Sequence, residues 1–455
     1  MCYMVHYVPD RKSKFVKKVK KRIPWIEHLI LENSFASEVN PEGLEYIQPK
    51  GSICLLCRGT KMLCGKQYCP LIKRAYVYLK LTSHYKATAI DGDAPPAVFI
   101  GRKGYPYVYA GPMVPPEHGD TSIYDLPETW FGRPLDDILM FRSKLIRGMF
   151  VTNVKKIHGT DKLLEKTREM ALSDIPVETE AVFKKIPKQR LVLDSDVQPM
   201  GPTAPLEKLS LDNVKIQRPV ERVYSDTDLR AADGILDLYT HKIEVTKIQR
   251  ILSVGAMGVE IDRKLVPTRW SITAVDSIIS KTLREEIKHY PLINEYRVFE
   301  TTYLDNRFLI LMIPRVWSYE LIEAWYPGTL WNPSMVNIGI AGDWEGYKGR
   351  TNYASIGGCY YAARLAITEY LKNERRQATV IIFRETLPGN NMPLGVWFVR
   401  ESVRNALKNE YKKFDSLEEA LKYTMSKLNI SIKYWYEVSG LLKELYKQRM
   451  LTEFL

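Results

Sequence analysis

The spacing of apolar residues along the chain predicts a protein that mixes helices with strands. Short alternating runs predict strands at residues 97–100 and 107–110. Apolar residues at helical spacing predict amphipathic helices over residues 133–150 and 161–172. The first half of the chain therefore contains both kinds of element.

From about Val245 the pattern alternates between helix and strand. The stretch "YRVFETTYLDNRFLILMIP" predicts a hairpin that turns at Asp305-Asn306, and "SITAVDSIISKTLREEIKHY" predicts a long helix capped by Ser271. Further elements are a helix at 357–371, a buried strand at 378–385, a helix at 395–414 and two closing helices. Antiparallel hairpins in a mixed pattern indicate the α+β class.

Residues 173–223 break this regularity, because they are rich in Pro, Asp and Val. We expect this stretch to be extended and to wrap the surface as a loose junction between two compact halves. A chain of 455 residues predicts two to three domains. The predicted units are a basic segment (1–50), a four-cysteine module (51–75), an N-terminal α+β half (76–244), a C-terminal α+β half (245–447) and a flexible tail (448–455).

The charge favours a polyanionic partner. The formal net charge is +13, and much of the excess lies in "RKSKFVKKVKKR" at residues 11–22. Nucleic acid is favoured over an anionic membrane surface, although the basic run could equally be a solvated helix. We find no apolar run of the ~18 residues that a membrane span needs and no signal peptide, so we expect a cytoplasmic, nucleoid-associated protein without membrane contact.

Four of the six cysteines lie within sixteen residues, in "CLLCRGTKMLCGKQYC". Cys54, Cys57, Cys64 and Cys69 have spacings that can close a tetrahedron around one metal ion. Disulfides are disfavoured in an intracellular chain, and free thiols rarely cluster so tightly. We expect structural zinc, with an iron–sulfur cluster as the alternative because Pro70 follows the last cysteine.

Three glycine-rich polar stretches between regular elements could carry chemistry, and one of them runs from "FRETLPGNN" into "MPLGVWFVRE" with Arg384, Glu385 and Arg400. In "IAGDWEGYKGRTNYASIGG", Asp343 and Glu345 could hold Mg²⁺ or Mn²⁺ beside a phosphate bound by Arg350. The alternative is a flexible loop with ordinary surface charges. His118 in "GPMVPPEHGDTS" is a candidate acid or base, or else part of a polar turn.

Several basic residues are candidates for phosphate contacts. In "DRKLVPTRWSI", basic residues flank Trp270, an arrangement that suits single-stranded nucleic acid, although Trp270 is favoured as a core anchor. The complete predicted set is Arg102, Lys103, Arg263, Lys264, Arg269, Arg350, Arg384 and Arg400.

The motifs together resemble the archaeal Nre family of DNA-repair proteins. The resemblance rests on the four-cysteine module, "IGRKGYPYVYAGPM", "DRKLVPTRWSITA", "GDWEGYKGRTNYASIGGCYYAARLAITEYL" and "MPLGVWFVRE", and it covers residues 54–455. It implies an archaeal protein with a zinc finger and a C-terminal motif for the sliding clamp PCNA. It brings no assigned catalytic residue.

The last eight residues fit such a motif. Gln448, Leu451, Phe454 and Leu455 have the spacing of a PCNA-binding peptide, with Leu455 in place of a second aromatic residue. The alternative is a last helical turn packed on the protein's own core.

Two functions follow from this sequence. The favoured hypothesis is a clamp-associated repair enzyme, a metal-dependent nucleic-acid or nucleotide hydrolase in which Asp343 and Glu345 bind the metal, Arg350 and Arg384 bind phosphate, and His118 acts as acid or base. The alternative is a non-enzymatic adaptor that binds DNA and brings other repair factors to the clamp. RNA as the nucleic acid stays open.

Overall fold

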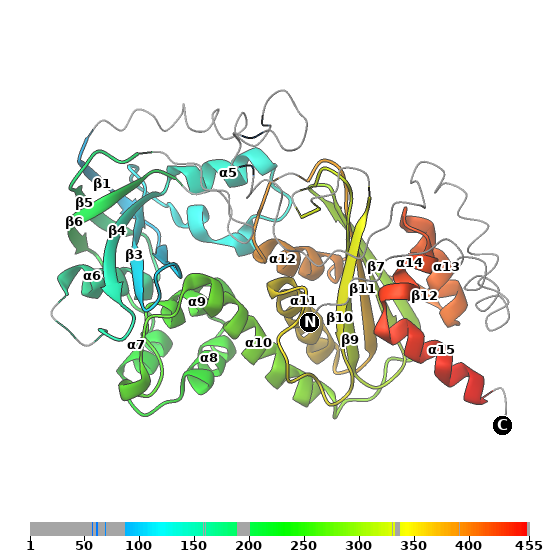
Figure 1. Ribbon diagram of the computed structural model, residues 1–455. Helices are drawn as coiled ribbons and strands as arrows, with labels where there is room; N and C mark the ends of the chain where they lie inside the picture. Colours follow the sequence, from blue (N-terminus) through cyan, green and yellow to red (C-terminus); the bar gives the residue numbers. More distant parts are fainter. Residues whose placement is uncertain are drawn as a thin grey trace.

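The computed structural model describes residues 87–452, except 158, 160, 189–200, 330, 333–336 and 391, together with Cys57, Lys61 and Cys69. This part of the chain forms two mixed six-stranded sheets with helices packed around them, which confirms a mixed α+β fold (Figure 1). It contains no helix long and apolar enough to cross a membrane.

The first sheet has the order β1-β5-β6-β4-β3-β2, with β4 and β6 parallel and the other neighbouring pairs antiparallel. Its core face packs on helix α6, where Leu164 and Met170 meet Val108 and Phe150. On the opposite face, Tyr107 and Tyr109 of β3 are exposed. The strands are β1 (Ala89–Ala94), β2 (Val98–Ile100), β3 (Tyr107–Val114), β4 (Ile146–Asn153), β5 (Val177–Phe183) and β6 (Thr203–Asp212), and α6 is Lys162–Leu172.

The second sheet has the order β10-β9-β11-β8-β7-β12, and only β9 and β11 are parallel among its neighbouring pairs. Its strands are β7 (Tyr296–Tyr303), β8 (Asn306–Ile313), β9 (Ser318–Trp325), β10 (Gly339–Glu345), β11 (Thr379–Thr386) and β12 (Lys412–Phe414). The predicted hairpin at Asp305-Asn306 is confirmed as the β7–β8 turn.

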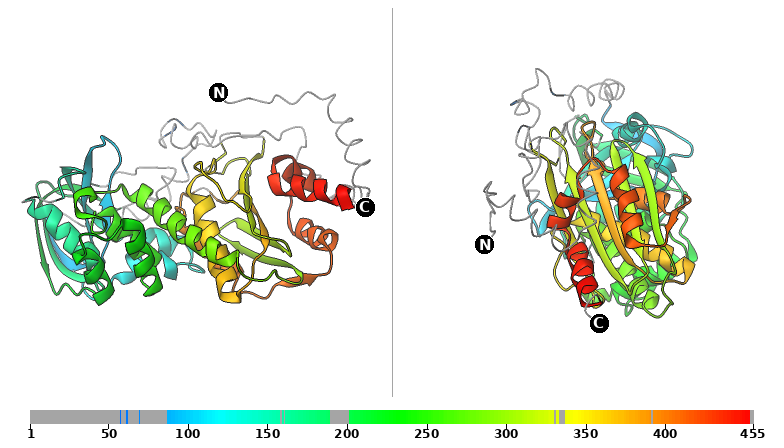
Figure 2. Two further views of the ribbon diagram at one scale, coloured as in Figure 1. Left: turned by 90° about the horizontal axis from the view of Figure 1, so that it is seen from below. Right: turned by 90° about the vertical axis from the view of Figure 1, so that its right-hand side faces the viewer.

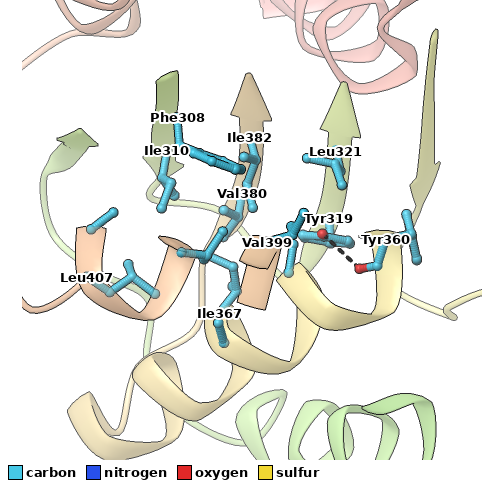
Figure 3. Close-up of a cluster of buried hydrophobic side chains, with 14 of the residues drawn as sticks. Phe308, Ile310, Tyr319, Leu321, Tyr360, Ile367, Val380, Ile382, Val399 and Leu407 are labelled. Atoms are coloured by element: carbon cyan, nitrogen blue, oxygen red, sulfur yellow. Dashed lines mark hydrogen bonds between the residues drawn. The ribbon is translucent and has the colours of Figure 1, made fainter. Parts of the chain in front are cut away.

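Strands β8 and β11 in the middle of this sheet contain unbroken apolar runs because both of their faces are buried. In β11, Val380 and Ile382 face one core, while Ile381 and Phe383 face the other. Helices α11 (Gly358–Glu374) and α12 (Trp397–Ala406) cover the first face, where the Tyr319 hydroxyl donates to the Tyr360 carbonyl at 3.1 Å (Figure 3). Three closing helices, one more than the sequence predicted, cover the second face: α13 (Leu417–Lys427), α14 (Ile432–Val438) and α15 (Gly440–Thr452).

Helix α10 (Thr268–Ile287) connects the two halves (Figure 2). It packs against α8 and α9 through Val275 and Ile279, and against α11 through the buried Leu365. The remaining helical elements are η3 (Ser122–Asp125), η4 (Pro127–Thr129), α5 (Leu135–Lys144), α7 (Arg218–Ser225), α8 (Ala231–Thr240), α9 (Val245–Ser253) and η5 (Glu260–Asp262).

Three predicted elements differ from the structure. The helix expected over 133–150 ends at Lys144, because the residues that follow alternate between buried and less buried positions and form β4 between β3 and β6. The helix expected over 395–414 ends at Ala406, and its last residues add β12 to the edge of the second sheet. The long helix begins at Thr268, three residues before the expected cap.

The stretch at 173–223 is also not the loose surface junction that its composition predicted. Its described residues supply β5, β6 and α7, and β5 and β6 lie inside the first sheet. The prediction was wrong because it relied on the content of proline and aspartate. The alternation of buried with more exposed positions in β5 is the pattern of a strand.

A buried ion pair joins α10 to α12. Both oxygens of Asp276 accept hydrogen bonds from Arg400 Nη1, at 2.9 and 3.1 Å, and Gln249 donates to Asp276 at 3.0 Å. Asp276 is fully buried and Arg400 is 1% exposed. Burial raises the pKa of Asp276 although Arg400 opposes the shift.

We predict that Asp276→Asn lowers the free energy of unfolding by about 3 kcal/mol, because it removes one partner of a buried charge pair. Urea unfolding followed by circular dichroism measures the change. Asp233→Asn, an exposed position on α8, is the control and should cost a few tenths of a kcal/mol. Equal losses in the two variants would contradict the role of this pair.

Candidate functional site

A cavity of about 320 Å³ lies where the first sheet meets the start of helices α10, α11 and α12. Tyr109, Met113, Arg147 and Met149 line it from the face of β3 and β4 that points away from the sheet's own core. The opposite wall comes from α9 and from the three helix starts. The cavity is therefore built by both halves of the chain.

The lining is strongly basic. It contains seven lysine or arginine residues and one carboxylate, Asp125. Arg142 and Arg250 both pair with that carboxylate, the latter at 2.6 Å. The seven cations are Arg102, Lys103, Arg142, Arg147, Arg250, Arg269 and Arg400. An excess of positive charge in a partly enclosed space attracts anions.

Arg147 is a partly buried cation of this lining. Burial first, and then the nearby Arg142, lower the pKa of Arg147 to about 10. Its guanidinium lies 4.7 Å from the centroid of the Phe99 ring, which holds it in a fixed position. An anion in the cavity would relieve this repulsion.

Three helix N-termini add to the positive potential. Helices α10, α11 and α12 begin at the cavity, their starts have no side-chain cap, and none has an acidic residue in its first turn. Aligned backbone dipoles make a helix start attractive to negative charge. A Cβ atom at Gly358 would lie 2.9 Å from Val396 Cγ1, so the glycine permits the close approach of α11 and α12 here.

Exposed aromatic side chains lie on the segments that line the cavity or next to them. We call them the aromatic rim: Tyr105, Tyr107, Tyr109, Trp270 and Tyr353, which are 46–63% exposed. Tyr109 and Tyr353 line the cavity itself, and the rings of Tyr105 and Trp270 lie 5.4 Å apart. Trp270, which the sequence favoured as a core anchor, is thus 47% exposed.

The predicted phosphate contacts divide into two groups. Arg102, Lys103, Arg269 and Arg400 line the cavity. Of these, Arg400 also holds Asp276 and Glu401, so it contributes to the fold as well as to the wall.

The other four predicted contacts lie outside the cavity lining. Arg263 donates to the carbonyls of Gly258 and Tyr224, and Lys264 is exposed. Arg350 pairs with Asp343 at 2.8 Å. Arg384 is buried, pairs with Glu323 and donates twice to Asn306 Oδ1. These contacts explain Arg263, Arg350 and Arg384 as structural residues.

The three predicted catalytic residues are not brought together. Asp343 and Glu345 lie on β10 in the second sheet. His118 follows β3 of the first sheet, where its ring nitrogens lie 3.6 and 3.7 Å from Asp91 and Asp93.

Both β10 carboxylates are already bound by cations. Burial tends to raise the pKa of Asp343, but hydrogen bonds from Arg350 and the Ser355 amide lower it. Glu345 is buried and pairs with Arg364 at 2.7 Å and with Arg284 at 3.2 Å. Their role as metal ligands stays a prediction, and within the described residues no group of three or more His, Cys, Asp or Glu could hold a metal ion.

The metal module and the clamp tail fall largely outside the described residues. Cys57 and Cys69 are described and buried, whereas Cys54 and Cys64 are not among the described residues. The α15 backbone reaches Thr452 and so includes Gln448 and Leu451, while Phe454 and Leu455 lie beyond it.

Sequence reasoning missed Arg142, Arg147 and Arg250. The first two sit in the stretch taken as one helix, so the turn between α5 and β4 that brings them to one place was not seen. The sequence did contain a signal for Arg250. In α9 this residue lies among apolar residues, such as Ile248 and Ile251, that mark the buried side of the helix.

The chain was compared with known families and proteins. The protein-family model described as "Archaeal Nre, N-terminal" matches residues 63–332 of this chain. The family model described as "Archaeal Nre, C-terminal" matches residues 345–454. No solved structure matches the chain significantly.

Three relatives come from two archaea, and each is named a DNA repair protein. NreB of Archaeoglobus fulgidus is 44% identical over 403 residues, which span 88% of this chain and 100% of that protein. NreA of the same organism is 37% identical over 84% of this chain and 95% of its own length. NreA of Haloferax volcanii is 34% identical over 76% and 84%, respectively. With both family models matched in order along its length, the chain belongs to the archaeal Nre family.

Proposed function

We propose that this protein acts in DNA repair and binds single-stranded DNA through the aromatic rim and the basic cavity behind it. The relatives support the repair role by their names. The observation that carries the DNA-binding proposal is a cavity lined by seven cations and by the exposed rings of Tyr109 and Tyr353, with further exposed aromatic side chains on neighbouring residues. Phosphates would pair with Arg102, Lys103 and Arg269, while bases stack on the rings.

A single strand fits this surface better than a duplex. Bases in a duplex are stacked on one another, so their faces are not available to Tyr105 or Trp270. Tyr105 shortly precedes β3, Trp270 follows Arg269 in the first turn of α10, and the two rings lie 5.4 Å apart. Contacts of this kind are tolerant of sequence, as a repair protein that meets many sites requires.

The proposal also includes recruitment to the sliding clamp. The spacing of Gln448, Leu451, Phe454 and Leu455 supports it, since one helical turn would direct the three apolar side chains into a hydrophobic pocket. Helix α15 ends at the far side of the second sheet from the cavity (Figure 1). A clamp bound there would leave the aromatic rim open, and tethering would raise the local concentration of the protein at DNA.

Binding is favoured here over hydrolysis as the task of this cavity. A metal-dependent hydrolase needs carboxylates free to hold the ion. Among the lining residues Asp125 is the one carboxylate, and Arg142 and Arg250 hold it. The adaptor hypothesis therefore has a specific observation in its favour, while the hydrolase of Asp343, Glu345 and His118 remains the second candidate.

We predict that Tyr105→Ala combined with Trp270→Ala weakens binding of labelled oligo-dT by about tenfold or more, because each stacked base contributes ~1–3 kcal/mol. Fluorescence anisotropy measures the affinity at a fixed salt concentration. Tyr347→Ala is the control, since Tyr347 is equally exposed but lies against Lys288 at the C-terminal end of α10, the opposite end from Trp270. An unchanged affinity in the double variant would exclude the rim as the DNA contact.

We predict that deletion of residues 448–455 abolishes binding to PCNA in isothermal titration calorimetry, since it removes every member of the motif. Oligo-dT binding should persist in the same protein, because the rim lies on other elements. A truncated chain that binds the clamp as tightly as the full chain would show that the contact lies elsewhere.

We propose that the four cysteines bind one structural zinc ion. Elemental analysis of the purified chain should give about one zinc per molecule, because four thiolates complete a tetrahedral site. Cys57→Ser should lower the zinc content, whereas Cys359→Ser should not, since Cys359 lies on α11 and outside the four-cysteine stretch of the sequence. A brown protein that contains iron would instead favour the iron–sulfur cluster.

A further inference from the structure

We propose that the cavity receives a single phosphorylated nucleotide. It would be either a free nucleoside phosphate or one nucleotide turned out of a strand that lies on the aromatic rim. This inference rests on the proposed DNA-binding function and adds the unit that the site recognises. The protein would then hold one nucleotide apart from its neighbours, which a surface that only stacks bases cannot do.

The size of the cavity agrees with such a ligand. Its volume of about 320 Å³ is at the lower end of the ~300–1,000 Å³ typical of small-molecule sites. A bare phosphate ion would leave most of this space empty. A duplex, or a strand of several stacked nucleotides, could not enter it.

The lining has the two kinds of surface that a nucleotide needs. Met113, Met149, Ile272, Leu394 and Trp397 provide apolar contacts for a base and sugar. Trp397 is held in place by an edge-to-face contact with Trp130 at 5.1 Å. A base can pack against such a wall without any specific hydrogen bond.

The phosphate would meet the opposite kind of surface. Arg147 and Arg269 line the same cavity, and the lining as a whole has a large excess of positive charge. The starts of α10, α11 and α12 direct the positive ends of three helices to the same space.

The aromatic rim connects this pocket to a strand. Tyr109 and Tyr353 belong to both the rim and the cavity lining, so a base that leaves the stack on the rim has a continuous aromatic path inward. A pocket for an unrelated anion, such as a carboxylic acid, would have no use for these exposed rings. The adjacency therefore favours a nucleotide.

Two titrations of the full-length protein test the inference. The first titrates dAMP, with inorganic phosphate as a comparison, in calorimetry. The second follows the fluorescence of a single 2-aminopurine within an oligonucleotide, which brightens when that base leaves the stack. Binding of dAMP would identify a free nucleotide as a ligand, and brightening without dAMP binding would identify a nucleotide within a strand.

Variants assign either signal to the cavity. Arg147→Gln and Arg269→Gln should each weaken dAMP binding, or the affinity measured by 2-aminopurine brightening, by about tenfold. Each variant loses a hydrogen bond between two charged groups, which is stronger than one between neutral groups. Arg269 is only partly buried, so its variant keeps the test valid if Arg147→Gln fails to fold. Lys208→Gln removes the same charge from an exposed position on β6 and should leave the signal unchanged.

Two results would overturn the inference. If the protein binds oligo-dT but gives neither dAMP binding nor brightening, the cavity does not take a nucleotide, and the proposed function stands without it. If phosphate binds as tightly as dAMP, the site is for a simple anion. Failure to bind any DNA would refute the proposed function itself, so the two failures are distinguishable.

Discussion

Helix α10 is held on both sides by buried pairs of arginine and carboxylate, and the rest of the structure depends on these pairs. Asp276 in the middle of the helix binds Arg400 of α12, and Arg284 near its end binds Glu345 of β10. Arg364 of α11 joins Glu345 as well. Removing one partner of a buried ion pair lowers the free energy of unfolding by several kcal/mol. Each pair therefore restricts the positions at which the neighbouring elements can pack on α10. The cavity lies at the start of α10 and takes its shape from this arrangement.

Pairing with carboxylates also separates the arginines of the fold from the arginines of the cavity. Arg350, Arg364 and Arg384 pair with acidic residues and rest against aromatic rings, so their charge is used within the fold. Arg147 instead lies in a wall where cations outnumber the single carboxylate. A net positive charge for the whole chain could not distinguish these roles. Their neighbours in space decide which arginines can serve a ligand.

Local pattern was enough to predict the fold class and several elements, among them the β7–β8 hairpin and the strand that became β11. It failed where two elements follow each other without a break. Lys144 ends α5 and Ile146 already begins β4, so the apolar residues of both read as one helix. For the site, basic residues beside Trp270 drew attention to the start of α10. The cavity itself could not be predicted, because Arg147 and Arg269 meet only through long-range packing.

The central claim is that nucleic acid lies on the aromatic rim and reaches the cavity. Ultraviolet cross-linking of a single-stranded oligonucleotide that carries photoreactive thymine analogues, mapped by mass spectrometry, tests it most directly. The account predicts cross-links to Tyr105, Tyr109 and Trp270 on the rim, and to Trp397 inside the cavity. Cross-links confined to the basic run at residues 11–22, or to Tyr347, which lies against Lys288 at the C-terminal end of α10, would contradict it.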